Sequence, residues 1–127
     1  MGRDVTETLV EYARPQPGMN VLDLASGTGE PSISLAVRVA PDGHVTALDL
    51  SPELLEIAAE RANQRRLKNF STLEADAHQL AFDDSSFDLV TSRFGVMFFQ
   101  DIARALGEVH RVLKPSSRAC FLAWGPI

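Results

Sequence analysis

The chain has 127 residues, of which 45% are hydrophobic and 23% are charged, and its formal net charge is −5. This composition is that of a globular protein with a core of its own, so we expect one domain over residues 1–127 and no extended disorder. The negative charge disfavours nucleic acid as a partner, because it repels a phosphate backbone. We find no signal peptide and no apolar run of the roughly 20 residues that a membrane span needs, so we expect a cytoplasmic protein.

The spacing of apolar residues predicts helices that alternate with strands along the whole chain. We expect strands at 19–25, 44–50, 71–76, 87–92 and 118–124. The first helix has Val5, Thr8, Leu9 and Tyr12 on its inner face, and the second runs from about 31 to 40. The third helix is capped by Ser51 and has Leu54, Leu55, Ala58, Ala59 and Ala62 inside, and the fourth has Ile102, Leu106, Val109 and Leu113 inside. Such alternation indicates an α/β fold, in which right-handed crossovers build a parallel sheet covered on both faces.

The first predicted strand runs into a turn of small residues, Asp23-Leu24-Ala25-Ser26-Gly27-Thr28-Gly29. Ligands of open parallel sheets bind at the carboxyl ends of the strands. Small residues at 25, 27 and 29 allow a ligand to approach the backbone closely. A glycine turn before a helix is also a common structural solution, so this motif alone fits a binding role and a structural role about equally.

Two further acids end neighbouring predicted strands. Asp49 follows the glycines by roughly 20 residues, which is the position of a ribose-binding acid. Asp76 ends the third strand, next to Ala77, where a carboxylate can accept a hydrogen bond from an adenine amino group. Taken singly, Asp49 also fits a capping or solvated acid and Asp76 a loop carboxylate, but the pairing of Asp49 with the glycine turn favours a nucleoside site.

The residues after the turn distinguish between two kinds of cofactor. The dinucleotide pattern G-x-G-x-x-G is incomplete, because its last position is Ser32. Glu30 and Pro31 stand where a pyrophosphate would rest, and there a carboxylate repels the phosphates while proline lacks an N–H to bind them. S-adenosylmethionine has no phosphate and meets neither obstacle, and Asp23 is placed to help hold the ammonium group of its amino-acid end.

Four segments, in order, resemble the class I S-adenosylmethionine-dependent methyltransferases, especially the group of ubiquinone and menaquinone biosynthesis. VLDLASGTGEPSISLA is similar to their first motif, TALDLSPELLEIA to the second, EADAHQLAFDDSSFDLVTSRFGVMFFQD to the adenine-binding turn with the fourth strand, and ALGEVHRVLKPSSRACFLAW to the next helix and the fifth strand. The resemblance implies a Rossmann-like three-layer sandwich with a mostly parallel sheet of about five strands in the order 3-2-1-4-5. The last two strands of the family are missing from this sequence.

The resemblance also implies which residues bind S-adenosylmethionine. They are Asp23, Ala25, Ser26, Gly27, Gly29, Asp49, Leu50, Asp76 and Ala77, with Arg93 against the methionine end. The sequence identifies no catalytic residue and no metal ligand. Because the sulfonium is already a good electrophile, positioning dominates methyl transfer, and a small or lipophilic molecule is the implied acceptor.

Two other functions stay open at this stage. An NAD-dependent oxidoreductase domain is disfavoured by Glu30, Pro31 and Ser32, whereas a non-catalytic or truncated cofactor-binding module is favoured by the missing strands. Residues 118–124 would then form an edge strand with almost no protecting charge, so we expect a homo-oligomer through this edge, unless a loop or the N-terminal helix covers it.

The remaining candidates are weaker. His44, His78 and His110 lack metal-ligand spacing, and His78 fits a loop position better than a site. Phe94, Met97, Phe98 and Phe99 fit either a substrate pocket or core packing. Cys120, the only cysteine, lies in an apolar run and is expected to be a small buried side chain.

Overall fold

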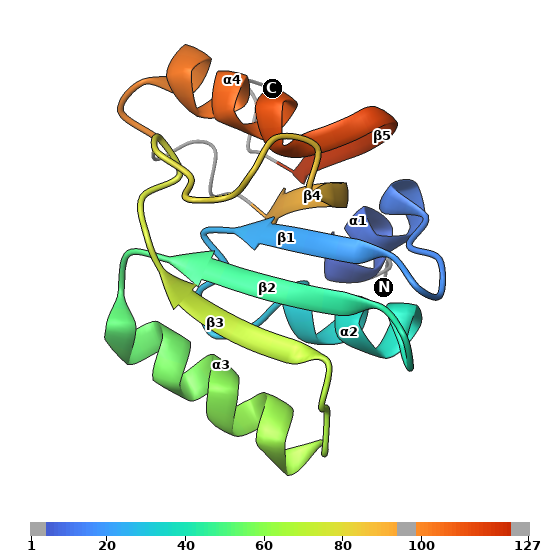
Figure 1. The fold of residues 1–127 in the computed structure, drawn as a ribbon. Helices are drawn as coiled ribbons and strands as arrows, with labels where there is room; N and C mark the ends of the chain where they lie inside the picture. The colour runs from blue at the N-terminus through green and yellow to red at the C-terminus, as the bar shows by residue number, and fades with distance from the viewer. Residues whose placement is uncertain (1–4, 94–98, 123–127) are drawn as a thin grey trace.

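The computed structural model describes residues 5–93 and 99–122. Five strands form one parallel sheet in the order β3-β2-β1-β4-β5 (Figure 1). Their bounds are β1 Asn20–Leu24, β2 His44–Asp49, β3 Phe70–Glu74, β4 Phe87–Arg93 and β5 Leu113–Leu122. The α/β class and the strand order expected from the sequence are therefore confirmed.

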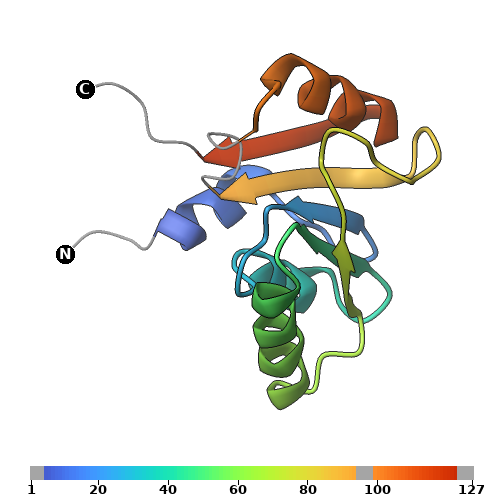
Figure 2. The same cartoon turned by 90° about the vertical axis from the view of Figure 1, so that its left-hand side faces the viewer.

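Four helices connect and cover the strands: α1 Val5–Ala13, α2 Ser32–Val39, α3 Pro52–Gln64 and α4 Ile102–Val112. Side chains of β1 point alternately to the two faces of the sheet, and two separate core clusters result. Val21 packs with residues of α1 and α2, whereas Leu22 and Leu24 pack with α4 and with the connection between β3 and β4. Figure 2 shows α1 beside β4 and β5, the strands that it contacts. The sheet is thus covered on both faces, as a three-layer sandwich requires.

Capping residues set the start of two helices. Ser51 Oγ accepts a hydrogen bond from the backbone N–H of Leu54 at 3.2 Å, with Pro52 in the first helical position, as the sequence predicted. Asp101 Oδ1 accepts from the N–H of Arg104 at 3.0 Å and begins α4 in the same way. Both caps lie at the carboxyl-end side of the sheet, next to Leu50 and Gln100, which line the site described below.

The predicted inner faces of α1 and α4 are correct only in part. In α1, Leu9 is buried as expected, but Val5 is 46% exposed and Tyr12 is 73% exposed, because Thr6, Val10 and Ala13 take the other inner positions. Ile102 and Leu106 are likewise exposed, and the inner face of α4 is formed by Ala105, Val109 and Val112. In both helices small or polar side chains take inner positions that the sequence pattern gave to larger apolar ones. The predicted inner face of α3 is confirmed in part, since Leu55, Ala58 and Ala62 are buried but Leu54 and Ala59 are exposed.

The fifth strand also begins earlier than expected. The sequence predicts Leu113 on the helix and a strand only from residue 118, but Leu113 already pairs with Phe87. A bulge follows, with Ser116 at φ 67°, before Arg118 pairs with Leu89. Residues 123 and 124 of the predicted strand lie outside the described residues. Cys120 is half-buried rather than buried, and this partial burial raises the pKa of its thiol.

Candidate functional site

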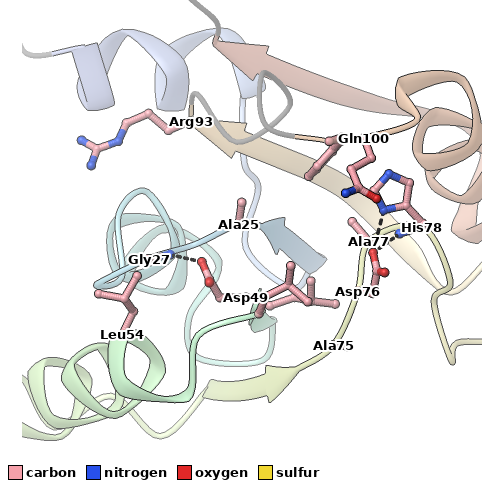
Figure 3. A pocket seen from close by; sticks show the side chains of 13 residues that line it. Ala25, Gly27, Asp49, Leu54, Ala75, Asp76, Ala77, His78, Arg93 and Gln100 are labelled. Atoms are coloured by element: carbon pink, nitrogen blue, oxygen red, sulfur yellow. Dashed lines mark hydrogen bonds and ion pairs between the residues drawn. The ribbon is translucent and has the colours of Figure 1, made fainter.

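A cavity of about 550 Å³ opens at the carboxyl ends of β1, β2 and β3 (Figure 3). Most of the residues that the sequence singled out line it: Ala25, Gly27, Asp49, Leu50, Asp76, Ala77 and Arg93. Its other lining residues are Leu48, Leu54, Ala75, His78, Phe99 and Gln100. Asp49 lies between the glycine turn on one side and the pair Asp76 and His78 on the other. The fold thus brings three separate sequence motifs to one cavity.

The glycine turn bends through backbone conformations that favour glycine. Ala25, Gly27 and Gly29 have φ angles of 52°, 56° and 110°. A side chain at Gly27 would meet no atom within 4 Å, whereas a Cβ at Gly29 would stand 2.8 Å from Cδ1 of Ile33. Glycine is therefore favoured at position 29 by its φ angle and by its close approach to Ile33 on α2, and Gly27 leaves open space on the cavity wall. Ala25 holds its left-handed conformation at a cost of about 1 kcal/mol.

Groups from β2 and α3 hold the turn in place. The backbone N–H of Gly27 donates to Oδ2 of Asp49 at 2.8 Å, and the N–H of Ser26 donates to the carbonyl of Leu48 at 2.9 Å. From α3, the guanidinium of Arg61 donates to the carbonyl of Thr28 at 2.9 Å. This last contact cannot be recognised in the sequence, because the two residues are far apart along the chain.

The N-terminus of α2 already has an anionic partner. The carboxylate of Glu30 accepts hydrogen bonds from the N–H of Ser34 at 3.3 Å and from its hydroxyl at 3.1 Å. A helix N-terminus is where a pyrophosphate binds in dinucleotide enzymes. Here a second anion would meet the charge of Glu30, so the geometry agrees with the objection to a dinucleotide that the sequence raised.

Asp49 presents a polar centre in the cavity. Its Oδ2 accepts from Gly27, and its Oδ1 accepts from the N–H of Ser51 at 2.9 Å. Each carboxylate oxygen has a second lone pair, so both oxygens can accept another hydrogen bond from a ligand hydroxyl. Beside this carboxylate, Leu50 is 68% exposed and Leu54 is 37% exposed. An apolar wall next to a fixed carboxylate suits a ligand with a flat ring attached to a polar sugar.

Asp76 and His78 form a pair on the opposite wall. Oδ1 of Asp76 accepts from the backbone N–H of His78 at 2.9 Å and lies 2.7 Å from Nδ1 of the ring. These hydrogen bonds hold the pKa of Asp76 below its usual value, the backbone bond being the larger cause. His78 had been interpreted as a loop residue, yet its ring lines the cavity and packs edge-on against Phe99 at 5.7 Å between centroids.

Arg93 ends β4 and lines the cavity near α1. Its guanidinium donates to the hydroxyl of Thr6 at 2.6 Å. This contact gives a reason for the inward position of Thr6 on α1. The remaining N–H groups of the guanidinium suit a carboxylate, which Arg binds through paired hydrogen bonds.

Three of the expected site residues do not line the cavity. Asp23 is completely buried behind the turn, where its Oδ1 accepts from the hydroxyl of Thr91 at 2.8 Å. Burial raises its pKa to about 7, while the hydroxyls of Thr91 and Ser32 lower it in part. Ser26 and Gly29 are buried as well. These residues therefore lie behind the turn and not on the wall of the cavity, and their contact with a cofactor stays a prediction.

Some candidates fall elsewhere. Phe99 lines the cavity, but Phe94, Met97 and Phe98 lie outside the described residues. His44 is at the opposite end of β2, where Nε2 lies 2.7 Å from Oγ of Ser71. Within residues 5–93 and 99–122, no group of three or more His, Cys, Asp or Glu side chains is arranged to hold a metal ion. In the same part of the chain, no helix is long and apolar enough to cross a membrane.

Residues 21–116, which include the whole glycine turn and both cavity walls, match the family model described as a methyltransferase domain. The chain belongs to this methyltransferase family. The matched region covers β1 to β4, α4 and the start of β5, so it contains the cavity and all of the strand ends that form it.

Named relatives agree with this assignment. The chain is 42% identical over 112 residues to a demethylmenaquinone methyltransferase of Listeria welshimeri. This alignment covers 87% of this chain and 48% of the relative. It is 40% identical over 117 residues to a 2-phytyl-1,4-naphtoquinone methyltransferase of Nostoc, which spans 91% of this chain and 51% of the relative. The chain spans about half the length of the curated relatives that it matches.

A solved structure shares the fold. The crystal structure of a SAM-dependent methyltransferase from Aquifex aeolicus superposes with a TM-score of 0.86 and is 26% identical in sequence. The match covers 95% of this chain and 68% of that one. The Rossmann-like sheet order therefore belongs to the architecture of this family.

Proposed function

We propose that this chain binds S-adenosylmethionine in the cavity and takes part in methyl transfer to a small or lipophilic acceptor of the quinone type. The observation that carries the proposal is the placement of Gly27, Asp49 and Asp76 on the wall of one cavity of about 550 Å³. The volume is in the range of pockets for ligands of this size. The named activities of the relatives support the reaction and the class of acceptor.

The nucleoside end of the cofactor fits the β2 and β3 side of the cavity. Asp49 would accept hydrogen bonds from the ribose hydroxyls, because both of its oxygens have a lone pair to spare. The exposed side chain of Leu50 would pack against the adenine ring, removing apolar surface from water. Asp76 and the adjacent Ala77 would bind the adenine edge, with the carboxylate accepting from the amino group.

The amino-acid end fits the β1 and β4 side. Arg93 would pair with the carboxylate, and the backbone of Ala25 and Gly27 would lie along the chain of the methionine. Asp23, Ser26 and Gly29 would contribute by shaping the turn, since they are buried behind it. When bound, S-adenosylmethionine supplies a methyl group on a cationic sulfur that is already a strong electrophile. The residues of this chain would orient that group, exclude water and hold the acceptor in line.

The acceptor side of the cavity includes Phe99, whose ring gives an apolar surface beside His78. An apolar surface of this kind favours a lipophilic ring over a charged acceptor. The dinucleotide alternative is disfavoured by the carboxylate of Glu30, which already caps α2. A non-catalytic cofactor-binding module differs from the proposed enzyme only in turnover, so an assay of methyl transfer separates the two.

Calorimetric titration tests the proposed cofactor site directly. The 127-residue chain is titrated in parallel with S-adenosylhomocysteine, the product form of the cofactor, and with NAD⁺. We expect saturable binding of S-adenosylhomocysteine at one site and no heat of binding from NAD⁺. Binding of NAD⁺ alone would exclude a methyltransferase function, and transfer of labelled methyl groups to a naphthoquinol would establish turnover.

We also propose that the chain associates with itself through β5. This strand forms the edge of the sheet within the described residues, and its unpaired backbone groups offer a template for another strand. The helix α1 contacts β5, and Arg118 donates to the carbonyl of Tyr12 at 3.2 Å, which partly shields the strand. Sedimentation at micromolar concentration is the test: dimers support the proposal, and a strict monomer contradicts it.

A single domain, a cytoplasmic location and the absence of nucleic acid among the partners stay predictions.

A further inference from the structure

His78 contacts two parts of the molecule that are distant in sequence. On one side its ring Nδ1 lies 2.7 Å from Oδ1 of Asp76. On the other side its Nε2 lies 3.1 Å from the backbone nitrogen of Asp101, the residue that caps α4. The side chain is 17% exposed, whereas that of Asp76 is 56% exposed. The histidine is thus the inner member of the pair, and the carboxylate is the member that faces the cavity.

These contacts determine the protonation of the ring. The backbone N–H of Asp101 can only donate, so Nε2 must accept and carries no proton. The proton of the neutral imidazole is therefore on Nδ1, where it is donated to Oδ1 of Asp76. A ring nitrogen fixed by its second hydrogen bond in this way orients the group that it donates to.

The consequence falls on Asp76. Its Oδ1 receives both the backbone N–H and the ring N–H of His78, and among the described residues nothing donates to its Oδ2. The carboxylate stays ionised, because these hydrogen bonds lower its pKa. Asp76 thereby offers one free acceptor oxygen in a fixed direction on the cavity wall.

We infer that His78 is a positioning residue for cofactor binding, which holds Asp76 toward the cavity and joins this wall to the first turn of α4. The inference rests on the proposed function, since it assigns the nucleoside end of S-adenosylmethionine to Asp76. It adds a residue that does not touch the reacting atoms but sets the orientation of one that touches the cofactor.

Two conservative substitutions separate the two contacts. In His78→Asn, the amide nitrogen stands at the same number of bonds from Cβ as Nδ1, so it can still donate to Asp76 but cannot reach Asp101. In His78→Gln, the amide oxygen matches Nε2, so it can still accept from Asp101 but leaves Asp76 without the ring donor. The first variant keeps the positioning contact and the second keeps the structural contact.

The experiment measures the affinity for S-adenosylhomocysteine by calorimetry and the Tm of the same samples. We expect His78→Asn to bind within about twofold of the wild-type chain despite a lower Tm, and His78→Gln to bind about tenfold more weakly with a Tm closer to that of the wild type. His78→Phe removes both contacts, so it should bind S-adenosylhomocysteine more weakly and also have a lower Tm than the wild-type chain.

The crossed pattern is what a purely structural role cannot produce. If affinity falls in step with Tm in all three variants, or if His78→Gln binds as tightly as His78→Asn, His78 only supports the fold and the inference is wrong. If the wild-type chain itself binds no S-adenosylhomocysteine, the proposed function fails and the inference fails with it.

Discussion

The carboxylate of Asp49 accepts a hydrogen bond from the backbone N–H of Gly27 at 2.8 Å, although the two residues are separated by 22 positions in the chain. The acid at the end of β2 and the glycine turn after β1 therefore form one unit before any ligand arrives. A preformed site of this kind loses little conformational entropy on binding. The spacing of these two motifs in the sequence is the length of the segment, α2 with β2, that leads from one strand end to the next.

The two glycines of the turn should respond differently to the same substitution. Gly29→Ala should lower the free energy of unfolding by about 2–4 kcal/mol, because its Cβ would stand 2.8 Å from Ile33 Cδ1 at a φ of 110°. Gly27→Ala should cost only about 1 kcal/mol, since its Cβ meets no atom within 4 Å and φ is 56°. Urea unfolding of both variants gives these values.

Cofactor binding by the folded variants should be affected more by the substitution of Gly27 than by that of Gly29. The methyl group at position 27 would occupy the cavity wall, so Gly27→Ala should weaken binding of S-adenosylhomocysteine by about tenfold or more. Unchanged affinity in Gly27→Ala would mean that Gly27 is only a turn residue. A greater loss of stability in Gly27→Ala than in Gly29→Ala would contradict the packing described here.

The buried Asp23 should make stability depend on pH. Burial raises its pKa to about 7 from the 3.8 of an exposed carboxyl, so the folded chain binds this proton more tightly than the unfolded chain. The contribution of Asp23 to the free energy of unfolding therefore falls as the pH rises from about 4 to about 7, because over this range the unfolded chain releases the proton while the folded chain still holds it.

Asp23→Asn removes this titration while Thr91 can still donate to the side-chain oxygen. The stability gained by the variant over the wild-type chain should be small near pH 4 and grow to about 3–4 kcal/mol near pH 8. Urea unfolding of both proteins across this pH range measures the difference. A difference that stays constant with pH would show that Asp23 does not carry the shifted pKa.

Arg111 on α4 holds the connection that carries the cavity wall formed by Asp76 and His78. Its guanidinium donates to the carbonyls of Leu80 and Phe82, both at 2.8 Å, and to Glu108, whose other oxygen accepts from the N–H of Leu80 at 2.8 Å. Lysine cannot make this set of directed bonds. Arg111→Lys should therefore lower Tm by several degrees, as measured by thermal unfolding.

The matched control is Arg65→Lys, which makes the same chemical change on an exposed residue near the end of α3. It should leave Tm unchanged. Equal values of Tm for Arg111→Lys and the wild-type chain would indicate that the carbonyl contacts do not stabilise the connection.

The strands and the main site residues could be predicted because their signals are local. The apolar run at 19–25 and the small residues that follow are visible in the sequence, and so is Asp49 near the end of the next run. The boundaries of the first four strands are accordingly correct within one or two residues. The beginning of β5 was missed because the turn residues at 114–117 form a bulge inside the strand.

The remaining errors concern contacts between distant residues. The sequence does not show that Arg93 binds the hydroxyl of Thr6, so Tyr12 was placed inside and Thr6 was not recognised. His78 does lie in a loop, as expected, but its contact with Asp101, 23 positions away, leaves no sign in the sequence. The burial of Asp23 is likewise a result of packing between α2 and β4, which periodicity along one strand cannot reveal.

The most direct measurement of the central claim is the affinity of Asp49→Ala for S-adenosylhomocysteine, with Asp42→Ala as control. Asp42 is an exposed acid at the opposite end of β2, so its removal changes the net charge equally without touching the cavity. We predict that Asp49→Ala binds about tenfold or more weakly by calorimetry, the loss expected for a hydrogen bond to a charged group, and that Asp42→Ala binds as the wild-type chain does. Equal affinities of Asp49→Ala and the wild-type chain would contradict the assignment of the cavity as the cofactor site.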